Sequence, residues 1–264
     1  MTSQYETKRL ITFDRIKIKS NYKYLLNTKV KFNEMFHSRS GEKIGIFYSS
    51  KDDINIPYNL YVAISYIKQT LTLEFSSKIL KEKYPDLISK DTIKECLTNI
   101  NQLNICDIDV DSILSNGAIT SVDVTYDANL ILSDNLLDVL NSQVHNYRRF
   151  KWVHYDKEGI TFTKDVKSQD CTETITLYNK EKEICTSHNK DFLNSLSQPQ
   201  SVIDYFKEKT RFEITLDTPK KIMKYLNLTD TKIFSVLNSD TNPILTQFDK
   251  VFGNSTANMP NTTF

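Results

Sequence analysis

The chain has 264 residues, of which 39% are hydrophobic and 11% aromatic, a composition typical of a folded globular protein. Its formal net charge is only +1, so overall charge gives no argument for binding nucleic acid. No apolar stretch approaches the roughly 18 residues that a membrane span needs, and the polar start MTSQYETKR does not resemble a signal peptide. The four cysteines lack a metal-binding spacing, and we therefore expect a soluble cytoplasmic protein with reduced thiols.

Basic residues gather in two runs although the chain as a whole is nearly neutral. In residues 8–39 lysine and arginine far outnumber aspartate and glutamate, and a second basic run covers residues 207–224. Either run would suit a phosphate backbone, and either would also suit a solvated surface that binds nothing.

The first third of the chain predicts β-strands, because apolar and polar residues alternate there and β-branched and aromatic side chains are frequent. The predicted strands cover residues 9–19, 43–50, 59–66 and 70–77. The alternation in the first of them breaks at Asp14, which predicts a β-bulge. Apolar residues then recur every three and four positions in 91–103, which predicts a helix with Asp91 as its N-cap.

The second half of the chain repeats this pattern of strands and helices. The predicted strands cover residues 118–128, 148–156, 159–165, 172–180 and 209–217, and the middle three are expected to be antiparallel. Ser133 is expected to cap a helix that follows it, and residues 199–206 predict a short helix. Thr218 and Pro219 are expected to be the N-cap and the first residue of a further helix.

The two halves resemble each other in sequence. TLEFSSKIL and RFEITLDTPKKI each predict a strand with a central glutamate, followed by a lysine-rich helix. We therefore predict an α+β fold of two related units, each an antiparallel sheet flanked by helices. They would arise from an internal duplication or from chance similarity between two strand–helix corners. The expected limits are an N-terminal unit at 1–115, a C-terminal unit carrying the site at 116–238, and a flexible tail at 239–264.

Several common catalytic sites are excluded by inspection. The chain has only five glycines, with no glycine-rich phosphate loop and no Gly-x-Ser-x-Gly elbow. Its four histidines are isolated, so neither a His-x-His metal pair nor a His-Glu-x-x-His helix is present. Chemistry would therefore have to come from carboxylates, lysines and tyrosines.

Four acidic residues on predicted strands are candidates. Asp123 and Asp127 are four apart on one strand, so both point to the same face, and Glu213 and Glu74 lie mid-strand in the two related segments. A charge between apolar strand neighbours is costly unless it is paired or bound to a cation. Each acid therefore either pairs with a neighbouring cation, as Glu213 would with Arg211, or contributes to a site for a hard cation such as Mg²⁺.

The segment TITLYNKEKE contains a candidate nucleophile, Tyr178. A free phenol has a pKa near ~10, so it needs help to lose its proton. A metal ion or Lys180 would stabilise the phenolate. Lys180 would share a face with Tyr178 if the strand continued, and Glu183 would bind the metal ion or orient Lys180.

Four motifs occur in an order that is similar to a known family: LTLEFSSKIL, ITSVDVTYDA, TLYNKEKE and TRFEITLDTPKKIMKYLNL. In this order and spacing, residues 41–228 resemble the gene II/X replication initiators of filamentous phages, a family of phage and plasmid rolling-circle replication proteins. The chain is shorter than a typical full initiator, so we expect some parts that complete origin binding to be missing or replaced.

The resemblance implies an enzyme that nicks one strand of a double-stranded origin and becomes joined to the 5′ phosphate through tyrosine. The freed 3′ hydroxyl would prime synthesis, and a later transesterification would close the displaced circle. The implied roles are Tyr178 and Lys180 as catalytic residues; Asp123, Glu183 and Glu213 as ligands of Mg²⁺ or Mn²⁺; and Glu74 and Asp127 as further acidic candidates.

The implied partners are the double-stranded origin, the single strand, and a host helicase and polymerase in the bacterial cytoplasm. Arg148, Arg149, Lys151 and Arg211 are expected to contact the DNA. Two alternatives remain open. A non-catalytic origin-binding or regulatory protein would bind DNA in a salt-sensitive way without needing Mg²⁺ or Tyr178. A metal-dependent nuclease that uses water would cut DNA without forming an adduct.

Overall fold

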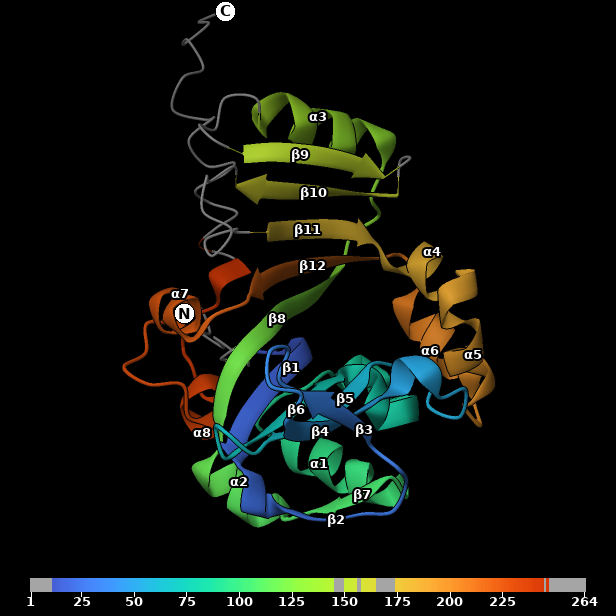
Figure 1. The fold of residues 1–264 in the computed structure, drawn as a ribbon. Helices are drawn as coiled ribbons and strands as arrows, with labels where there is room; N and C mark the ends of the chain where they lie inside the picture. Colours follow the sequence, from blue (N-terminus) through green and yellow to red (C-terminus); the bar gives the residue numbers. More distant parts are fainter. Residues whose placement is uncertain (1–10, 145–149, 156–157, 165–173, 245, 247–264) are drawn as a thin grey trace, which may run out of the picture.

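The computed structural model describes residues 11–144, 150–155, 158–164, 174–244 and 246. One antiparallel sheet runs through the molecule in the order β3-β4-β5-β6-β1-β8-β12-β11-β10-β9 (Figure 1). Its strands are β1 (Phe13–Asn21), β3 (Asn33–Phe36), β4 (Lys43–Ser49), β5 (Leu60–Ser65), β6 (Thr70–Ser76), β8 (Ala118–Asn129), β9 (Phe150–Tyr155), β10 (Gly159–Lys164), β11 (Thr174–Asn179) and β12 (Lys209–Leu216). A small second sheet pairs β2 (Leu25–Thr28) with β7 (Cys106–Ile108).

The helices of the described residues lie in the connections between these strands and after the last strand, β12. They are α1 (Ile93–Gln102), α2 (Val110–Asn116), α3 (Asp134–Val144), α4 (Lys180–Ile184), α5 (Lys190–Asn194), α6 (Pro199–Phe206), α7 (Pro219–Leu226) and α8 (Ile233–Leu237). Short 3₁₀ segments are η1 (Tyr22–Tyr24), η2 (Ser50–Asp52), η3 (Ser77–Asp86) and η5 (Ser187–Asn189). Helices α4, α5 and α6 all lie in the connection from β11 to β12, at one end of these strands (Figure 1).

The two halves of the large sheet have the same topology. The central strands β1 and β8 are neighbours, and after each of them the chain moves to the outer edge of its own half, at β3 or β9. In the N-terminal half the chain then passes inward through β4 and β5 to β6, which lies beside β1. In the C-terminal half it passes inward through β10 and β11 to β12, which lies beside β8. This repeat agrees with the predicted α+β fold of two related units, whereas the predicted limits of those units remain a prediction.

The strand register makes Glu74 and Glu213 equivalent positions. Arg15 and Asp123 lie opposite each other where β1 meets β8. Two residues further along β1 Lys17 faces Glu74, and two residues further along β8 Thr125 faces Glu213. An approximate two-fold axis at the Arg15–Asp123 pair therefore relates the two glutamates.

The two faces of the sheet differ sharply in polarity, because side chains alternate along each strand. One face carries fully buried residues such as Ile16, Phe75, Val124 and Leu177. The opposite face carries the polar residues of the same strands, including Glu74 and Glu213. We call this second surface the polar face.

Most predicted elements are confirmed within a few residues of their expected limits. The register shift between Phe13 and Arg15 confirms the bulge at Asp14. Ser133 Oγ accepts a hydrogen bond from the Leu136 amide, and Thr218 Oγ1 accepts one from the Lys221 amide, as expected for N-caps.

Three local expectations are wrong. The strand that carries Glu74 is followed by the 3₁₀ segment η3, which is broken at Lys81, and not by the predicted lysine-rich helix. Helix α1 begins at Ile93 after Thr92, not after Asp91, because the Thr92 hydroxyl is tied to the backbone of Leu87 and Ser89 just upstream. Strand β11 ends at Asn179, whose side chain caps α4, so Lys180 does not continue the strand.

No helix in the described part of the chain is long and apolar enough to cross a membrane. Most of the predicted tail at 239–264 lies outside the described residues.

Candidate active site

Tyr178 is the penultimate residue of β11 and lies between Gly159 on β10 and Arg211 on β12. A Cβ atom at Gly159 would come within 2.7 Å of the Tyr178 Cβ and 2.8 Å of the Leu177 carbonyl oxygen. Only glycine therefore lets β10 pair this closely with β11 beside Tyr178. The Tyr178 side chain remains partly exposed.

The Tyr178 hydroxyl donates a hydrogen bond of 3.1 Å to Glu213 Oε1. Burial raises the pKa of Glu213 to about 7, and the nearby carboxylate of Asp14 acts in the same direction. Burial, followed by the charge of Glu213, also raises the pKa of Tyr178 well above its ordinary value. At neutral pH the Tyr178 phenol therefore stays protonated, and the neighbouring Glu213 side chain is protonated in part of the molecules and ionised in the rest.

Lys180 starts α4 and is almost completely buried. Its ammonium forms an ion pair with Glu183 and lies 5.6 Å from the centre of the Tyr178 ring. The same Nζ is 5.2 Å from the ring centre of Tyr84 and 5.3 Å from that of Phe206. Burial and the repulsion of Arg211 lower the pKa of Lys180, although Glu183 opposes this. Lys180 lies near Tyr178 although the strand does not continue to it, so the expected reason for their proximity is wrong, and the role of Lys180 remains a prediction.

A side chain from η5 holds Glu183 in place. Asn189 Nδ2 donates to Glu183 Oε1 at 2.9 Å and to the Glu183 carbonyl at 2.7 Å. Lys78, at the start of η3, donates from its Nζ to Asn189 Oδ1. A chain of polar contacts thus runs from Lys78 through Asn189 and Glu183 to Lys180, beneath Tyr178.

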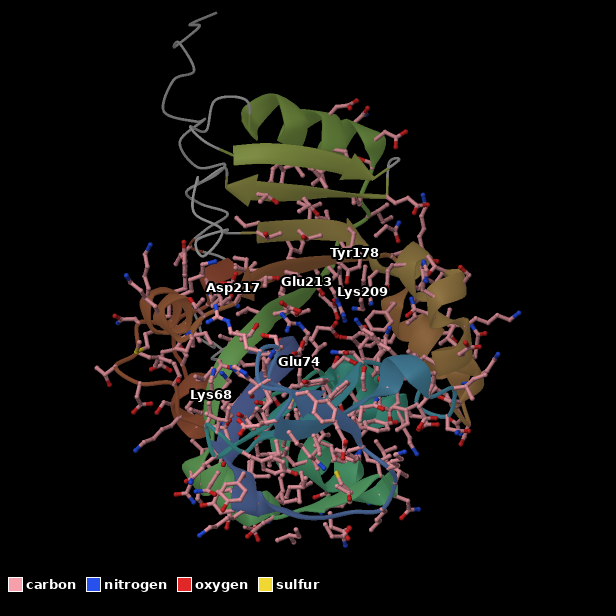
Figure 2. All side chains as sticks on the ribbon, viewed as in Figure 1. Lys68, Glu74, Tyr178, Lys209, Glu213 and Asp217 are labelled. Atoms are coloured by element: carbon pink, nitrogen blue, oxygen red, sulfur yellow. The ribbon has the colours of Figure 1, made fainter. Side chains whose placement is uncertain are left out.

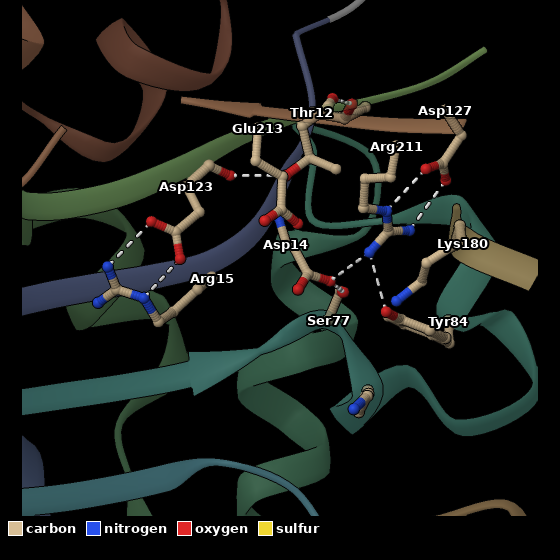
Figure 3. A network of polar contacts seen from close by, with 12 residues as sticks. Thr12, Asp14, Arg15, Ser77, Tyr84, Asp123, Asp127, Lys180, Arg211 and Glu213 are labelled. Atoms are coloured by element: carbon tan, nitrogen blue, oxygen red, sulfur yellow. Dashed lines mark hydrogen bonds and ion pairs between the residues drawn. The ribbon is translucent and has the colours of Figure 1, made fainter. Parts of the chain in front are cut away.

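Arg211 forms the centre of a second, buried network (Figure 3). Its guanidinium binds both carboxylate oxygens of Asp127, at 2.7 and 2.9 Å, and also contacts Asp14 at 3.1 Å and the Tyr84 hydroxyl at 2.9 Å. Burial alone would raise the pKa of Asp14, but Arg211, Lys180 and a hydrogen bond from Ser77 together lower it.

These contacts correct two expectations for Arg211. The side chain has no exposed surface, so it does not form the DNA contact that we predicted. It is also not hydrogen-bonded to Glu213, because its donors are directed to Asp127, Asp14 and Tyr84.

A third network crosses the sheet at its centre. Asp123 accepts hydrogen bonds from Arg15 at 2.7 and 3.0 Å and from the Thr215 hydroxyl at 2.8 Å. Arg15 also binds Glu74 at 2.9 Å, and Lys17 binds the other Glu74 oxygen at 2.9 Å. Asp123, Asp127 and Glu74 therefore each follow the simpler of the two interpretations, in which an acid pairs with a cation.

The predicted metal ligands do not converge. Asp123 is held by Arg15, Glu183 by Lys180 and Asn189, and Glu213 by Tyr178. Among the described residues, no group of three or more His, Cys, Asp or Glu side chains is placed to hold a metal ion. This arrangement does not fit the predicted Mg²⁺ or Mn²⁺ site.

A cavity of about 420 Å³ opens beside Tyr178. It is lined by Glu158, Gly159, Thr161, Thr176, Tyr178, Asn179, Glu183 and Thr186. Its walls are mostly polar or small side chains, and the candidate nucleophile is one of them. Figure 2 shows Tyr178 next to Glu213, with Glu74 further along the sheet.

The remaining predicted DNA contacts lie at or beyond the edge of the described structure. Arg148 and Arg149 lie outside the described residues. Lys151 belongs to the edge strand β9, where it pairs with Thr163 of β10.

Sequence reasoning missed four residues of the site: Asp14, Lys78, Tyr84 and Asn189. For Asp14 there was a signal, because a charge that breaks strand alternation has to be accommodated by a partner. The other three lie in 3₁₀ segments, where no periodic pattern indicates which way a side chain points.

Comparison with known proteins places the chain in a family. Residues 87–235 match the family model for the N-terminal region of the phage gene II replication-associated protein, and this range contains Tyr178, Lys180, Glu183 and Glu213. No curated protein sequence matches the chain significantly. Because the family match covers more than half of the chain, the protein belongs to the family of filamentous-phage gene II replication initiators and is a replication-associated protein.

Proposed function

We propose that this protein nicks one strand of DNA with Tyr178 as the nucleophile and Glu213 as the general base. The observation that carries the proposal is the hydrogen bond from the Tyr178 hydroxyl to a glutamate whose pKa is about 7. A general base is most effective when its pKa lies near the working pH and when it touches the proton that it removes. The family match supports DNA as the substrate.

In the proposed step the Tyr178 oxygen forms a bond to phosphorus while its proton passes to the Glu213 carboxylate. The bond from phosphorus to the 3′ oxygen breaks, and that oxygen leaves with the electron pair and takes up a proton from water. The products are a 5′-phosphotyrosine link and a free 3′ hydroxyl.

Religation is the reverse of this step with a different 3′ hydroxyl. The incoming hydroxyl oxygen attacks phosphorus and gives up its proton to water. The bond from phosphorus to the Tyr178 oxygen breaks, and protonated Glu213 returns its proton to that phenol oxygen. A carboxyl group with a pKa near 7 can serve in both directions at neutral pH, whereas an ordinary glutamate would be ionised and unable to return the proton.

Lys180 would assist through its charge, because its buried ammonium lies close to the Tyr178 ring. A positive charge there favours the negative charge that develops on the phenol oxygen and on phosphate. Glu183 and Asn189 hold this part of the site together, so we assign them positioning roles.

The proposal extends to rolling-circle initiation at an origin in the bacterial cytoplasm, with a host helicase and polymerase acting after the nick. No step is assigned to a metal ion, because the described carboxylates do not fit a metal site. The test therefore compares Mg²⁺, Mn²⁺ and a chelator directly.

The test is to incubate the purified protein with supercoiled DNA of its own replicon and with end-labelled single strands from the origin. A denaturing gel separates free DNA from DNA joined to protein. We expect an adduct with the wild type and its loss, by at least about 10³-fold, with Tyr178→Phe. Tyr205→Phe, which removes the hydroxyl of an exposed tyrosine on α6, is the matched control and should keep the adduct.

Two outcomes would contradict the proposal. Nicking without an adduct would favour hydrolysis by water and would exclude Tyr178 as the nucleophile. Salt-sensitive binding with neither nicking nor adduct would favour a DNA-binding relative without catalysis.

A further inference from the structure

The polar face carries two partly exposed aromatic rings in the N-terminal half of the sheet, well away from Tyr178. In one cross-strand row Phe47 of β4 lies beside Ala63 of β5. In the next row Tyr61 of β5 lies beside Glu74 of β6. The Phe47 and Tyr61 ring centres are 6.0 Å apart and the ring planes are inclined by 31°. Both side chains are partly exposed, although aromatic rings of this size usually lie buried in a core.

The same two rows end in lysines on β1. The Phe47 row continues through Ala63 and Thr72 to Lys19, so only small side chains separate the ring from the lysine. The Tyr61 row continues through Glu74 to Lys17. Neighbouring strands are about 4.8 Å apart, which places Lys17 about 10 Å from Tyr61 along its row.

These lysines belong to a mainly basic depression of about 450 Å³. It is lined by Arg15, Lys17, Lys19, Glu74, Thr120, Ser121, Asp217 and Pro219. One of its two acids, Asp217, forms an ion pair with Lys221, and the other, Glu74, is shared between Arg15 and Lys17. Lys19 is exposed. Arg15 is also paired with Asp123, so the depression keeps a small excess of positive charge, carried by Lys17 and the exposed Lys19.

We propose that this surface binds single-stranded DNA, with bases stacked on Phe47 and Tyr61 and the backbone phosphates against Lys17 and Lys19. Stacking on exposed aromatic rings beside a positive groove is the general way in which proteins hold unpaired strands. The rings are accessible only to bases whose own faces are exposed, which excludes an intact duplex. The charge of the neighbouring lysines favours a polyanion over a neutral protein partner.

The site is independent of the nicking chemistry. Its four residues lie before residue 87, outside the range that the family model matches. Tyr61 and Tyr178 lie on strands that are five positions apart in the sheet, which corresponds to about 24 Å. A strand bound here would lie on the same sheet surface as Tyr178 but would not touch it.

The test is fluorescence anisotropy of a labelled oligothymidine, which contains no origin and no duplex, with the full chain. We expect Phe47→Leu together with Tyr61→Leu to weaken binding by about 10- to 100-fold, because leucine keeps an apolar side chain on the strand but cannot stack. Tyr66→Leu is the matched control, since this exposed tyrosine lies in the turn after β5 and not in either row. The control should bind like the wild type.

The lysines are tested by salt dependence. In Lys17→Gln and Lys19→Gln, the slope of log Kd against log salt concentration should decrease by about 0.7 for each lysine. Lys19→Gln keeps the test valid if the aromatic variant fails to fold, because Lys19 is exposed and its replacement does not disturb the core.

Three results would overturn the proposal. Wild-type affinity in the folded aromatic variant would do so, as would an unchanged salt slope in both lysine variants. The aromatic variant should bind a duplex of the same length as tightly as the wild type does. An equal loss of affinity for duplex and for single strand would contradict base stacking. None of these results depends on whether Tyr178 forms an adduct.

Discussion

Glu74 and Glu213 occupy equivalent positions in the two halves of one sheet, yet their electrostatic surroundings are opposite. Glu74 binds two cations, Arg15 and Lys17, which lower its pKa even though burial acts to raise it. Glu213 accepts a hydrogen bond from a neutral phenol, and burial raises its pKa to about 7. The same residue at the same register position thus has a lowered pKa in one half and, in the other, a pKa of about 7 and a hydrogen bond from a phenol.

The difference arises from what lies opposite each glutamate. The central strand of the N-terminal half places Lys17 against Glu74, whereas the central strand of the C-terminal half places Thr125 against Glu213. Arg211, the nearest strand cation to Glu213, is directed to Asp127 and Asp14. In this sheet the glutamate whose neighbouring arginine is bound by other acids is the one with the raised pKa.

The largest expected effect separates the two glutamates by activity. Glu213→Gln should lower the single-turnover rate of adduct formation by about 10²- to 10⁴-fold, the usual contribution of a general base. Glu74→Gln should leave that rate within a few-fold of the wild type, because Glu74 touches Arg15 and Lys17 and not the phenol. Equal losses of rate in the two variants would contradict a role for Glu213 that Glu74 does not share.

The next effect concerns the two arginine networks and is measured by chemical unfolding. Arg211→Ala leaves Asp127, whose side chain is only 3% exposed, without its cation, and we expect it to cost about 3–5 kcal/mol of folding free energy. Arg15→Ala leaves Asp123 and Glu74, which are each 19% exposed and partly hydrated, so it should cost less, about 1–2 kcal/mol. A cost for Arg15→Ala equal to or above that of Arg211→Ala would show that the two networks do not differ in burial as described.

A smaller effect is expected from pH. If Glu213 must be ionised to accept the proton, a pKa of about 7 predicts a rise of about tenfold in the adduct-forming rate between pH 6 and pH 8. The rise should be absent in Glu213→Gln and present in Glu74→Gln. A rate that is flat across this range in the wild type would exclude Glu213 as the base.

The two glutamates should also affect stability in opposite directions. The pKa of Glu213 is raised on folding from 4.5 to about 7, so its contribution to stability decreases as pH rises between these values. The pKa of Glu74 is lowered on folding, so its contribution is present above pH 4.5 and is lost as pH falls through the lower value. The unfolding free energies of Glu213→Gln and Glu74→Gln, measured against pH, should diverge from the wild type in these separate windows.

Sequence patterns were sufficient for most of the fold. Strand alternation located the strands on which Glu74 and Glu213 lie, and the similarity of those two strands anticipated their equivalent places in the sheet. The spacing of Lys180 and Glu183 anticipated a contact that the structure contains. These are local features, which depend on residues only a few positions apart.

The rest of the site depends on contacts between distant segments. Arg211 meets Asp14 across 197 positions of sequence, and no local pattern indicates that the bulge at Asp14 brings its carboxylate to β12. The helix after Tyr178 was overlooked although Asn179 is a good N-cap, since a strand ending in charged residues resembles a strand that continues. The predicted metal ligands do not converge, because Asp123 and Glu213 are bound by side chains from distant segments and Glu183 by its near neighbours Lys180 and Asn189.

The measurement that tests the central claim most directly is the identification of the residue joined to DNA. The adduct formed with an origin strand would be digested with nuclease and protease, and the peptide carrying the residual nucleotide would be sequenced by mass spectrometry. We expect the nucleotide on Tyr178, in the segment that contains Asn179 and Lys180. A nucleotide on any other tyrosine would contradict the account, since it is the Tyr178 hydroxyl that donates its hydrogen bond to Glu213.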